Sequence, residues 1–220
     1  LFSPSFTSAY GTDAGKNSTS SNEISVQFSA CRNVFEKWTL TGNAWFYYFP
    51  VSRYLCHDKS YGWDYRVQLH HDNHRFSVRQ QRSILDKGIT DKQSLRMQTT
   101  LFLSETLSLG LRTDLVNSVL KGTKNEWGAA AYIQLAYRGK KEQFAGSFRV
   151  SIFNTRSWDS RIYVYESDVL YGFSVPALYG KGVRSYLNIK YTPLSYMDLW
   201  FRISCTYKDK PDVDAKIQIR

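Results

Sequence analysis

Hydrophobic and polar residues alternate along most of the chain with a period of two, the pattern of a β-strand with one apolar and one polar face. In residues 127–138, every odd position carries an aromatic or aliphatic side chain. The clearest segments are 37–49, 63–71, 94–103, 107–115, 127–138, 144–152, 183–191, 197–207 and 214–220, with weaker copies at 24–31 and 75–81. No comparable window has a helical period with capping residues. The pattern predicts an all-β protein of about eleven strands.

The length of these segments separates two classes of β protein. Most of them run for roughly 9–11 residues, which is the length a tilted strand needs to cross a bilayer. Strands of soluble proteins average about 5–6 residues. The lengths therefore favour an antiparallel up-and-down transmembrane β-barrel over a soluble barrel or sandwich with an aromatic core, which remains the alternative.

The apolar face of the predicted strands carries almost no charge. A charged side chain facing lipid at the bilayer midplane costs a barrel about 2–4 kcal/mol, so this is expected of a lipid-facing surface. Aromatic residues gather on the same face near strand ends, as in interfacial girdles; they are Trp38, Tyr48, Trp63, Trp127, Tyr137 and Tyr191. We therefore expect the bacterial outer membrane as the location and its lipid as a partner.

The connections between predicted strands alternate between short and long, as in outer-membrane barrels with short inner turns and longer outer loops. Residues 32–36, 72–74, 104–106, 139–143 and 193–196 are short, and residues 50–62, 82–93 and 116–126 are long. The alternation holds only if residues 154–181 form one long outer connection. Their many apolar residues predict either a tall hairpin above the membrane or a segment folded into the mouth.

An odd number of strands is unusual for a single-chain bacterial barrel. Residues 1–22, rich in Ser, Thr, Gly and Asn, fit an outer loop or linker, and residues 23–220 hold the strands. An open edge in lipid would leave backbone groups unsatisfied. We expect the chain to be part of a larger barrel, with the remainder of that barrel or another outer-membrane protein as partner.

Basic residues outnumber acidic ones, 29 to 19, for a net charge of +10. On the predicted polar face, thirteen basic residues stand against only Asp64, Asp114, Asp198 and Asp214. A basic lumen would guide anions or hold phosphate-bearing polymers. The alternative is that acidic residues of other strands or of a plug neutralise it. The residues predicted to face anions are Arg66, Arg79, Arg96, Arg112, Arg149, Arg184 and Arg202.

No other residue pattern predicts specific chemistry. His70, His71 and His74, with Asp72 between them, fall in a tight turn whose spacing does not converge on a tetrahedral metal centre. His71 has no evident serine partner of the kind a lipase-type barrel needs, and Cys31, Cys56 and Cys205 suggest free thiols. We predict no cofactor, no metal and no enzymatic activity.

Five stretches resemble one known family: KWTLT at 37–41, FYYFP at 46–50, DSRIYVYESDVLYGFSVP at 159–176, YLNIKY at 186–191 and LWFR at 199–202. They look like the C-terminal barrel of the large Bacteroidota outer-membrane proteins that carry an N-terminal helix-hairpin-helix (ComEA-like) domain. The resemblance covers most of residues 23–220, and residues 159–176 are its most specific part. The chain departs from it in lacking the helix-hairpin-helix, in a shorter loop at 208–213, and in ending before the usual terminal aromatic residue.

These observations predict an integral outer-membrane β-barrel protein that is a component of a channel or envelope complex with a basic lumen. One alternative is a barrel for DNA uptake or anchoring, with nucleic acid as the partner. That idea follows from the resemblance, because a helix-hairpin-helix commonly holds a DNA backbone. A second alternative is a passive accessory subunit that docks a partner through residues 154–181.

Overall fold

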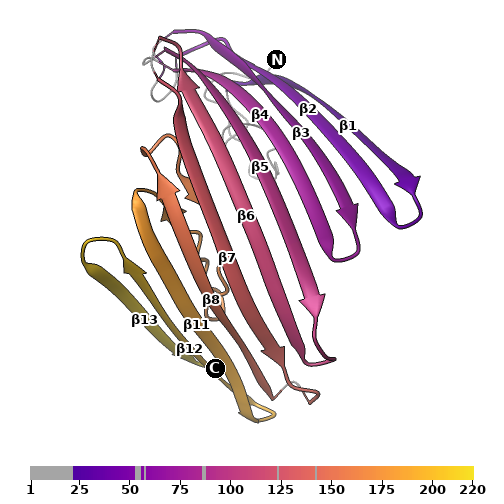
Figure 1. The fold of residues 1–220 in the computed structure, drawn as a ribbon, viewed down its shortest axis with the longest axis vertical. Coiled ribbons are helices and arrows are strands. Elements are labelled where there is room, and N and C mark those ends of the chain that lie inside the picture. The colour runs from indigo at the N-terminus through magenta and orange to yellow at the C-terminus, as the bar shows by residue number, and fades with distance from the viewer. Residues whose placement is uncertain (1–21, 53–55, 57, 86–87, 123, 142) are drawn as a thin grey trace. The chain divides into compact units, whose positions relative to one another are not determined.

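The computed structural model describes residues 22–52, 56, 58–85, 88–122, 124–141 and 143–220. Eleven long strands form one antiparallel sheet that follows chain order, with β8 beside β11 (Figure 1). They are β1 (Ile24–Phe35), β2 (Trp38–Phe49), β3 (Ser60–His71), β4 (His74–Leu85), β5 (Gly88–Phe102), β6 (Leu107–Leu120), β7 (Glu126–Arg138), β8 (Phe144–Thr155), β11 (Lys181–Leu194), β12 (Met197–Tyr207) and β13 (Pro211–Ile219). The predicted all-β, antiparallel, up-and-down fold is confirmed. Within the described residues, no helix is long and apolar enough to cross a bilayer.

The chain divides into two compact units. The first contains residues up to 71 together with 77–94 and 117–125. Its best-buried part lies on the polar face of β2, where Tyr47 and Phe49 are 3% and 0% exposed. The Tyr47 hydroxyl donates to the Arg82 carbonyl at 2.8 Å. A Cβ at Gly62 would lie 2.2 Å from that carbonyl oxygen, so this close approach requires glycine.

The second unit contains residues 72–76, 95–116 and 126–220. The register across its strands keeps apolar side chains on one face. Ile133 of β7 lies opposite Val150 of β8, and Ile203 of β12 lies opposite Leu187 of β11. Because side chains alternate along each strand, this register also aligns the polar residues on the other face.

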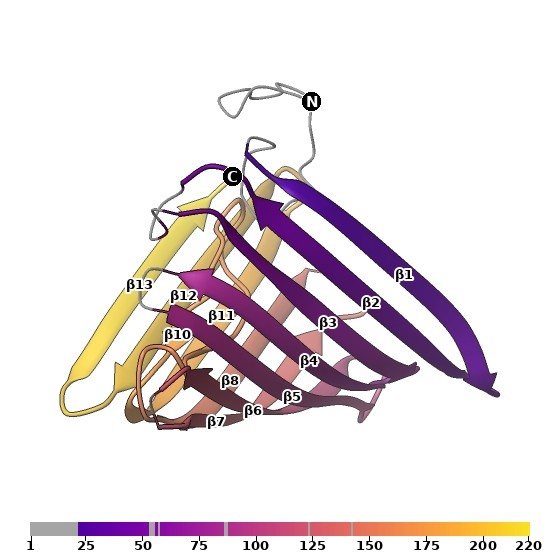
Figure 2. The same ribbon diagram turned by 90° about the horizontal axis from the view of Figure 1, so that it is seen from above.

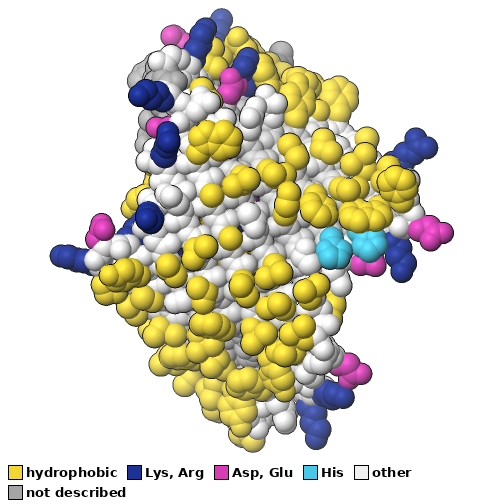
Figure 3. Space-filling model, in the orientation of Figure 1, with side chains coloured by type: hydrophobic (Ala, Val, Ile, Leu, Met, Phe, Trp, Pro, Cys, Tyr) yellow, Lys and Arg dark blue, Asp and Glu magenta, His cyan; other side chains and the backbone are white. Residues whose placement is uncertain are grey.

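The polar face of the strands is buried and the apolar face is exposed, which is the reverse of the arrangement in a soluble protein. Arg202, Arg149 and Arg112 of the polar face are 1%, 5% and 8% exposed, whereas Ile133 and Ile152 of the apolar face are 58% and 59% exposed. Figure 3 shows hydrophobic side chains over much of one face, with charged side chains mainly at its margins. A soluble sandwich buries its apolar faces against each other. The alternative of a soluble protein with an aromatic core is therefore contradicted.

Two of the predicted long loops are wrong. Residues 82–93 were expected as a loop, but β4 continues to Leu85 and β5 begins at Gly88. Likewise β6 reaches Leu120 and β7 begins at Glu126, which shortens the loop predicted at 116–126. Arg82 and Asp91 interrupt the alternation at residues 82–93, but they pair with each other in the structure. Arg82 contacts Asp91 at 2.5 Å, and its guanidinium lies 4.4 Å from the centroid of the Trp63 ring. The short connections are confirmed.

Residues 156–180, which we call the fold-back segment, connect β8 to β11. They contain two short paired strands, β9 (Ile162–Tyr163) and β10 (Ala177–Leu178). The segment lies along a single side of the strands that flank it (Figure 2). Its contacts with the polar face show a segment folded back on the strands rather than a tall hairpin, and its predicted place in the mouth of a barrel stays a prediction. Residues 1–21 lie outside the described residues, so the predicted outer loop at 1–22 stays a prediction.

Candidate functional site

The fold-back segment is a bent hairpin with one buried and one exposed side. Ile162 pairs with Leu178, and an isolated bridge joins Glu166 to Ser174 farther along. Ile162, Val164 and Glu166 are 3%, 2% and 1% exposed, whereas the alternate residues Tyr163 and Tyr165 are 46% and 57% exposed. The alternation of an extended chain therefore directs two aliphatic side chains and one carboxylate towards the sheet.

A small apolar cluster anchors one end of the segment to the sheet. It consists of buried residues of β6, β7, β8 and the segment: Val116, Ala130, Phe153, Ile162, Val164 and Leu178. The backbone comes very close to β7 here, since a Cβ at Gly128 would lie 2.4 Å from the Ser160 carbonyl oxygen and 2.9 Å from Thr155 Cγ2. The packing of the segment therefore depends on glycine at this position.

Glu166 is the most buried acidic residue of the segment, and two arginines bind it. Arg184 of β11 donates from Nε and Nη2 to the two carboxylate oxygens, both at 2.8 Å. Arg202 of β12 donates from Nη2 to Oε2 at 2.6 Å. Arg202 also contacts Asp214 of β13 at 3.2 Å. A paired, bidentate arrangement of this kind is the favourable way to bury such charges.

Asp168 forms the second ionic contact, at the turn of the hairpin. Lys216 Nζ lies 2.9 Å from its Oδ2, and the Val169 backbone N–H donates to Oδ1 at 2.8 Å. Burial raises the pKa of Asp168, but the hydrogen bonds from Lys216 and Val169 and the charge of Arg202 outweigh it and hold the pKa of this carboxyl below its usual range. Asp168 is therefore a fixed negative charge above the acid range.

Arginines of three strands also bind the backbone of the segment. Arg112 of β6 donates to the Tyr163 carbonyl at 3.1 Å, and Arg149 of β8 donates to the Tyr165 carbonyl at 2.6 Å. Arg202 donates to the Ser167 carbonyl at 3.1 Å. Three alternate carbonyls thus each receive a charged donor from the sheet. The polar face holds the segment by main chain as well as by side chain.

The seven arginines predicted to face anions all lie on the polar face, and most contact carboxylates of this chain. Arg79 pairs with Asp64, and Arg66 lies opposite Asn43 on the same face. Arg96 and Arg112 share Asp114, at 2.7 and 2.6 Å. Arg184 and Arg202 bind the fold-back segment, as does Arg149 through the Tyr165 carbonyl. Whether any of the seven faces an anion in function stays a prediction.

Sequence reasoning missed Glu166 and Asp168. It counted acidic residues only within the predicted membrane strands, and these two lie in a connection whose facing could not be assigned. The alternation Ile162, Val164, Glu166 was the available signal, because it gives the connection an inward side of its own.

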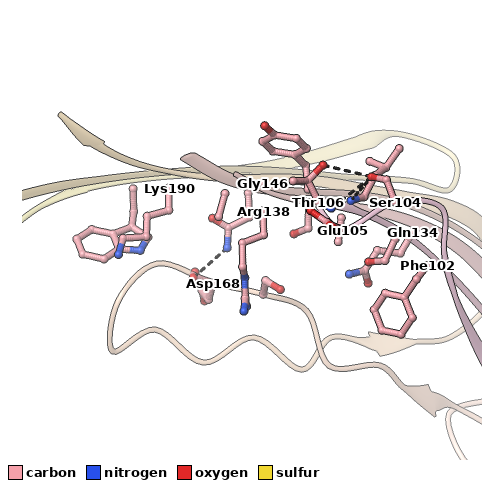
Figure 4. Close-up of a pocket in the computed structure, with 18 residues that line it drawn as sticks. Phe102, Ser104, Glu105, Thr106, Gln134, Arg138, Gly146, Asp168 and Lys190 are labelled. Atoms are coloured by element: carbon pink, nitrogen blue, oxygen red, sulfur yellow. Dashed lines mark hydrogen bonds between the residues drawn. The ribbon is translucent and has the colours of Figure 1, made fainter. Parts of the chain in front are cut away.

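Two of the cavities between the segment and the sheet lie beside basic side chains of the strands. The larger, of about 470 Å³, extends from the hairpin turn at Asp168 to Gln134, Arg138 and Lys190 on the strands. Figure 4 shows these side chains projecting from the sheet towards the loop that carries Asp168. The smaller, of about 260 Å³, lies beside Arg112, Arg149 and Tyr165. The smaller is lined mainly by hydroxyl, amide and basic groups, which suits water or a polar solute, whereas the larger has polar and apolar walls in equal part.

The described residues contain no group of three or more His, Cys, Asp or Glu side chains arranged to hold a metal ion. The His71 ring packs 4.6 Å from the Trp38 ring, centroid to centroid, and His74 Nδ1 lies 3.2 Å from the Thr99 hydroxyl. Cys31, Cys56 and Cys205 are free thiols.

The chain matches no protein-family model and no curated protein. Among solved structures it is similar to CdiB from Acinetobacter baumannii, at 13% identity over 90% of this chain and 44% of that chain, with a TM-score of 0.47. It is also similar to the NanC porin, at 8% identity over 90% of this chain and 97% of that chain, with a TM-score of 0.39. The chain spans less than half the length of the CdiB chain. These similarities concern the arrangement of strands alone.

Proposed function

We propose that the chain is an integral outer-membrane β-barrel protein and a component of a channel or envelope complex. Its apolar face meets lipid and its polar face lines an interior. The fold-back segment lies in that interior as a built-in constriction, which sets the width and the charge of the path beside it.

The reversed burial of the two faces carries this proposal. Leaving a large aliphatic or aromatic side chain in water costs about 1.5–3 kcal/mol compared with burying it. Exposed large hydrophobic side chains recur along the apolar face, including Val26, Phe28, Val67, Val78, Ile133, Phe148, Ile152, Ile203 and Ile217. Soluble monomers rarely expose apolar patches beyond a few hundred Å². Contact of the apolar face with lipid acyl chains removes this cost, and the charged residues of the polar face stay buried on the other side of the strands.

The contacts of the fold-back segment support its role as a constriction. Arg202 and Glu166 are each 1% exposed, and removing one partner of such a pair typically costs about 3–5 kcal/mol. The segment is therefore held firmly against the strands. The acidic residues of the fold-back segment make the polar face less positive than its strands alone would be. Passage of a solute therefore depends on which basic residues the segment leaves uncovered.

Heat modifiability tests the barrel class. The eleven strands form an open sheet from β1 to β13, so the test uses the complete barrel. We expect the unheated barrel in dodecyl sulfate to migrate faster than the boiled one, because closed barrels resist unfolding by the detergent. The chain should also partition into detergent extracts of membranes. Recovery of a monodisperse protein in buffer without detergent contradicts the proposal.

Planar-bilayer conductance tests the constriction. Glu166→Gln should raise the conductance or its noise, because Arg184 and Arg202 lose the carboxylate that holds the segment. Glu36→Gln is the matched control, since Glu36 is exposed in the turn between β1 and β2 and is not among the residues that line the two cavities beside the segment. Separately, Arg96→Glu should reduce anion selectivity, because Arg96 is 43% exposed and accessible from the interior. Equal currents from the protein and both Glu variants contradict the constriction.

One observation favours the accessory-subunit alternative. The outer side of the fold-back segment exposes Tyr171 and Phe173, which are 87% and 78% exposed, beside Tyr165. A plugged accessory barrel that docks a partner through these rings should show no open channel. The DNA alternative and the helix-hairpin-helix resemblance stay predictions. Phosphate contacts would make DNA binding by the full-length protein weaken steeply with salt.

A further inference from the structure

The smaller cavity is built around two buried arginines. Its lining comes from β5, β6, β7, β8 and the fold-back segment, and includes Gln98, Thr100, Ser108, Gln134, Arg112 and Arg149. Arg112 and Arg149 are 8% and 5% exposed. The Tyr132 ring lies between them, 3.9 Å from the Arg149 guanidinium carbon and 5.8 Å from that of Arg112. Two cationic groups are therefore fixed on the wall of one small polar space.

Arg149 has no carboxylate partner among the described residues. Its Nε donates to Gln134 Oε1 at 3.0 Å, its Nη2 donates to the same oxygen, and its Nη1 donates to the Tyr165 carbonyl at 2.6 Å. Both acceptors are neutral. A guanidinium has five N–H donors, so these bonds use three of them. A buried charge with neutral partners alone is costly, because nearby countercharge normally offsets its lost hydration.

The neighbouring arginines do not relieve this charge. Asp114 is the one acidic residue paired with this group within the described chain, and both Arg112 and Arg96 already bind it. Arg112 donates to Asp114 from Nε and Nη2, which leaves its Nη1 without an acceptor in the described residues. Arg112 and Arg149 thus line a cavity of about 260 Å³, and the carboxylate of this group, Asp114, binds Arg112 and Arg96 but not Arg149 among the described residues.

We propose that this cavity binds a small oxyanion, carboxylate or phosphate, with Arg149 and Arg112 as the charged donors. The planar fork of a guanidinium matches two oxygens of either group, which a spherical halide does not offer. The hydroxyls of Thr100 and Ser108 supply further donors. The volume limits the ligand to a few heavy atoms, below the usual range of about 300–1,000 Å³ for drug-sized ligands.

Gln134 makes the proposal testable with a nearly isosteric change. Its side-chain oxygen occupies the place beside Arg149 where an ion pair would put a carboxylate. Gln134→Glu therefore gives Arg149 an internal anion without changing the size of the side chain. The variant should stabilise the empty protein and reduce oxyanion affinity about tenfold or more, because hydrogen bonds between charged groups are the strong ones.

The experiment measures the thermal midpoint and the binding isotherm of the purified protein in detergent at low ionic strength. The titrants are inorganic phosphate and acetate, with chloride as the spherical control. We expect saturable stabilisation by phosphate, acetate or both, and none by chloride at equal ionic strength. The oxyanion that binds more tightly identifies the class of ligand, phosphate or carboxylate. Lys140→Gln, which removes one positive charge at a position 76% exposed, should bind as the unaltered protein does.

Two results overturn the proposal. One is stabilisation by chloride equal to that by both oxyanions. The other is an oxyanion affinity of Gln134→Glu within twofold of that of Lys140→Gln. Arg149→Gln provides a second route, since it should abolish binding if it folds, and Gln134→Glu decides the matter if it does not. The readout needs no current, so a barrel that fails to conduct leaves this inference intact.

Discussion

The polar face carries two arginine clusters that differ in their balance of charge. In the segment-binding cluster, Arg184, Arg202 and Lys216 meet three carboxylates, Glu166, Asp168 and Asp214. In the cavity cluster, Arg96 and Arg112 share Asp114, and Arg149 has no carboxylate partner among the described residues. The first cluster has its countercharges built into the chain, so it serves to hold structure. The second keeps an excess of positive charge, and it is the cluster in which we propose an oxyanion site.

The largest expected effect comes from breaking the balanced cluster. Glu166→Gln leaves Arg202, 1% exposed, without its main carboxylate, and should lower the free energy of unfolding by about 3–5 kcal/mol. Urea unfolding in lipid vesicles, followed by tryptophan fluorescence, measures the change. Glu105→Gln, at an exposed pair, should shift it by less than about 1 kcal/mol. Similar losses in the two variants would show that the segment-binding cluster does not hold the segment.

The next effect comes from separating the fold-back segment from the sheet without touching a charge. Gly128→Val forces a side chain against the Ser160 carbonyl and should cost about 1–3 kcal/mol through overpacking. Limited proteolysis should then cut the displaced segment near the exposed residues Tyr171 and Phe173. Gly42→Ala is the control, since a Cβ there meets nothing within 4 Å. Unchanged protease resistance in Gly128→Val would contradict the close packing.

A smaller effect of opposite sign is expected in the cavity cluster. Gln134→Glu supplies the missing countercharge and should raise the free energy of unfolding by about 1 kcal/mol, the net value of a typical hydrogen bond. Chemical denaturation at low ionic strength measures it. The same substitution at Gln143, outside this cavity, is a control for added negative charge. A destabilised Gln134→Glu protein would mean that Arg149 is already neutralised.

The smallest effect is the pH dependence of the balanced cluster. The pKa of Asp168 is below its ordinary value of 3.8, so the unfolded chain binds this proton more readily than the folded one. The stability that Asp168 contributes is therefore full above about pH 3.8 and is lost as the pH falls through the lower pKa of the folded protein. Unfolding of the protein and of Asp168→Asn should be compared from pH 7 down to pH 2. A difference that grows in acid contradicts this sign.

The alternation of side chains was enough to predict most of the fold. It placed all eleven long strands, because each keeps one apolar face over its membrane-length core. It failed at residues 82–93, where Arg82 and Asp91 interrupt the apolar face and are neutral only as a pair. A pattern of single residues cannot show that two charges on adjacent strands meet.

The candidate site was predictable only in its basic half. The strand period placed Arg112, Arg149 and Arg202 on the polar face, since their facing depends on local sequence alone. Glu166 reaches Arg184 and Arg202, and Asp168 reaches Lys216, across long sequence separations and from a segment with two short strands. No period along the chain reports such a tertiary contact. The difference between the two clusters therefore appears only when the chain is folded.

The way the fold-back segment is attached leaves its length and sequence free to vary without changing the sheet. Its two ends leave the sheet side by side, because β8 and β11 are paired up to Asn154 and Lys181. A tight turn could join β8 and β11 in the same register, so the fold-back segment is an insertion between the two strands of a hairpin. Exchanging the segment would leave the pairing of β8 with β11 unchanged while altering the side chains that cover the polar face, which makes this position suitable for engineered variants.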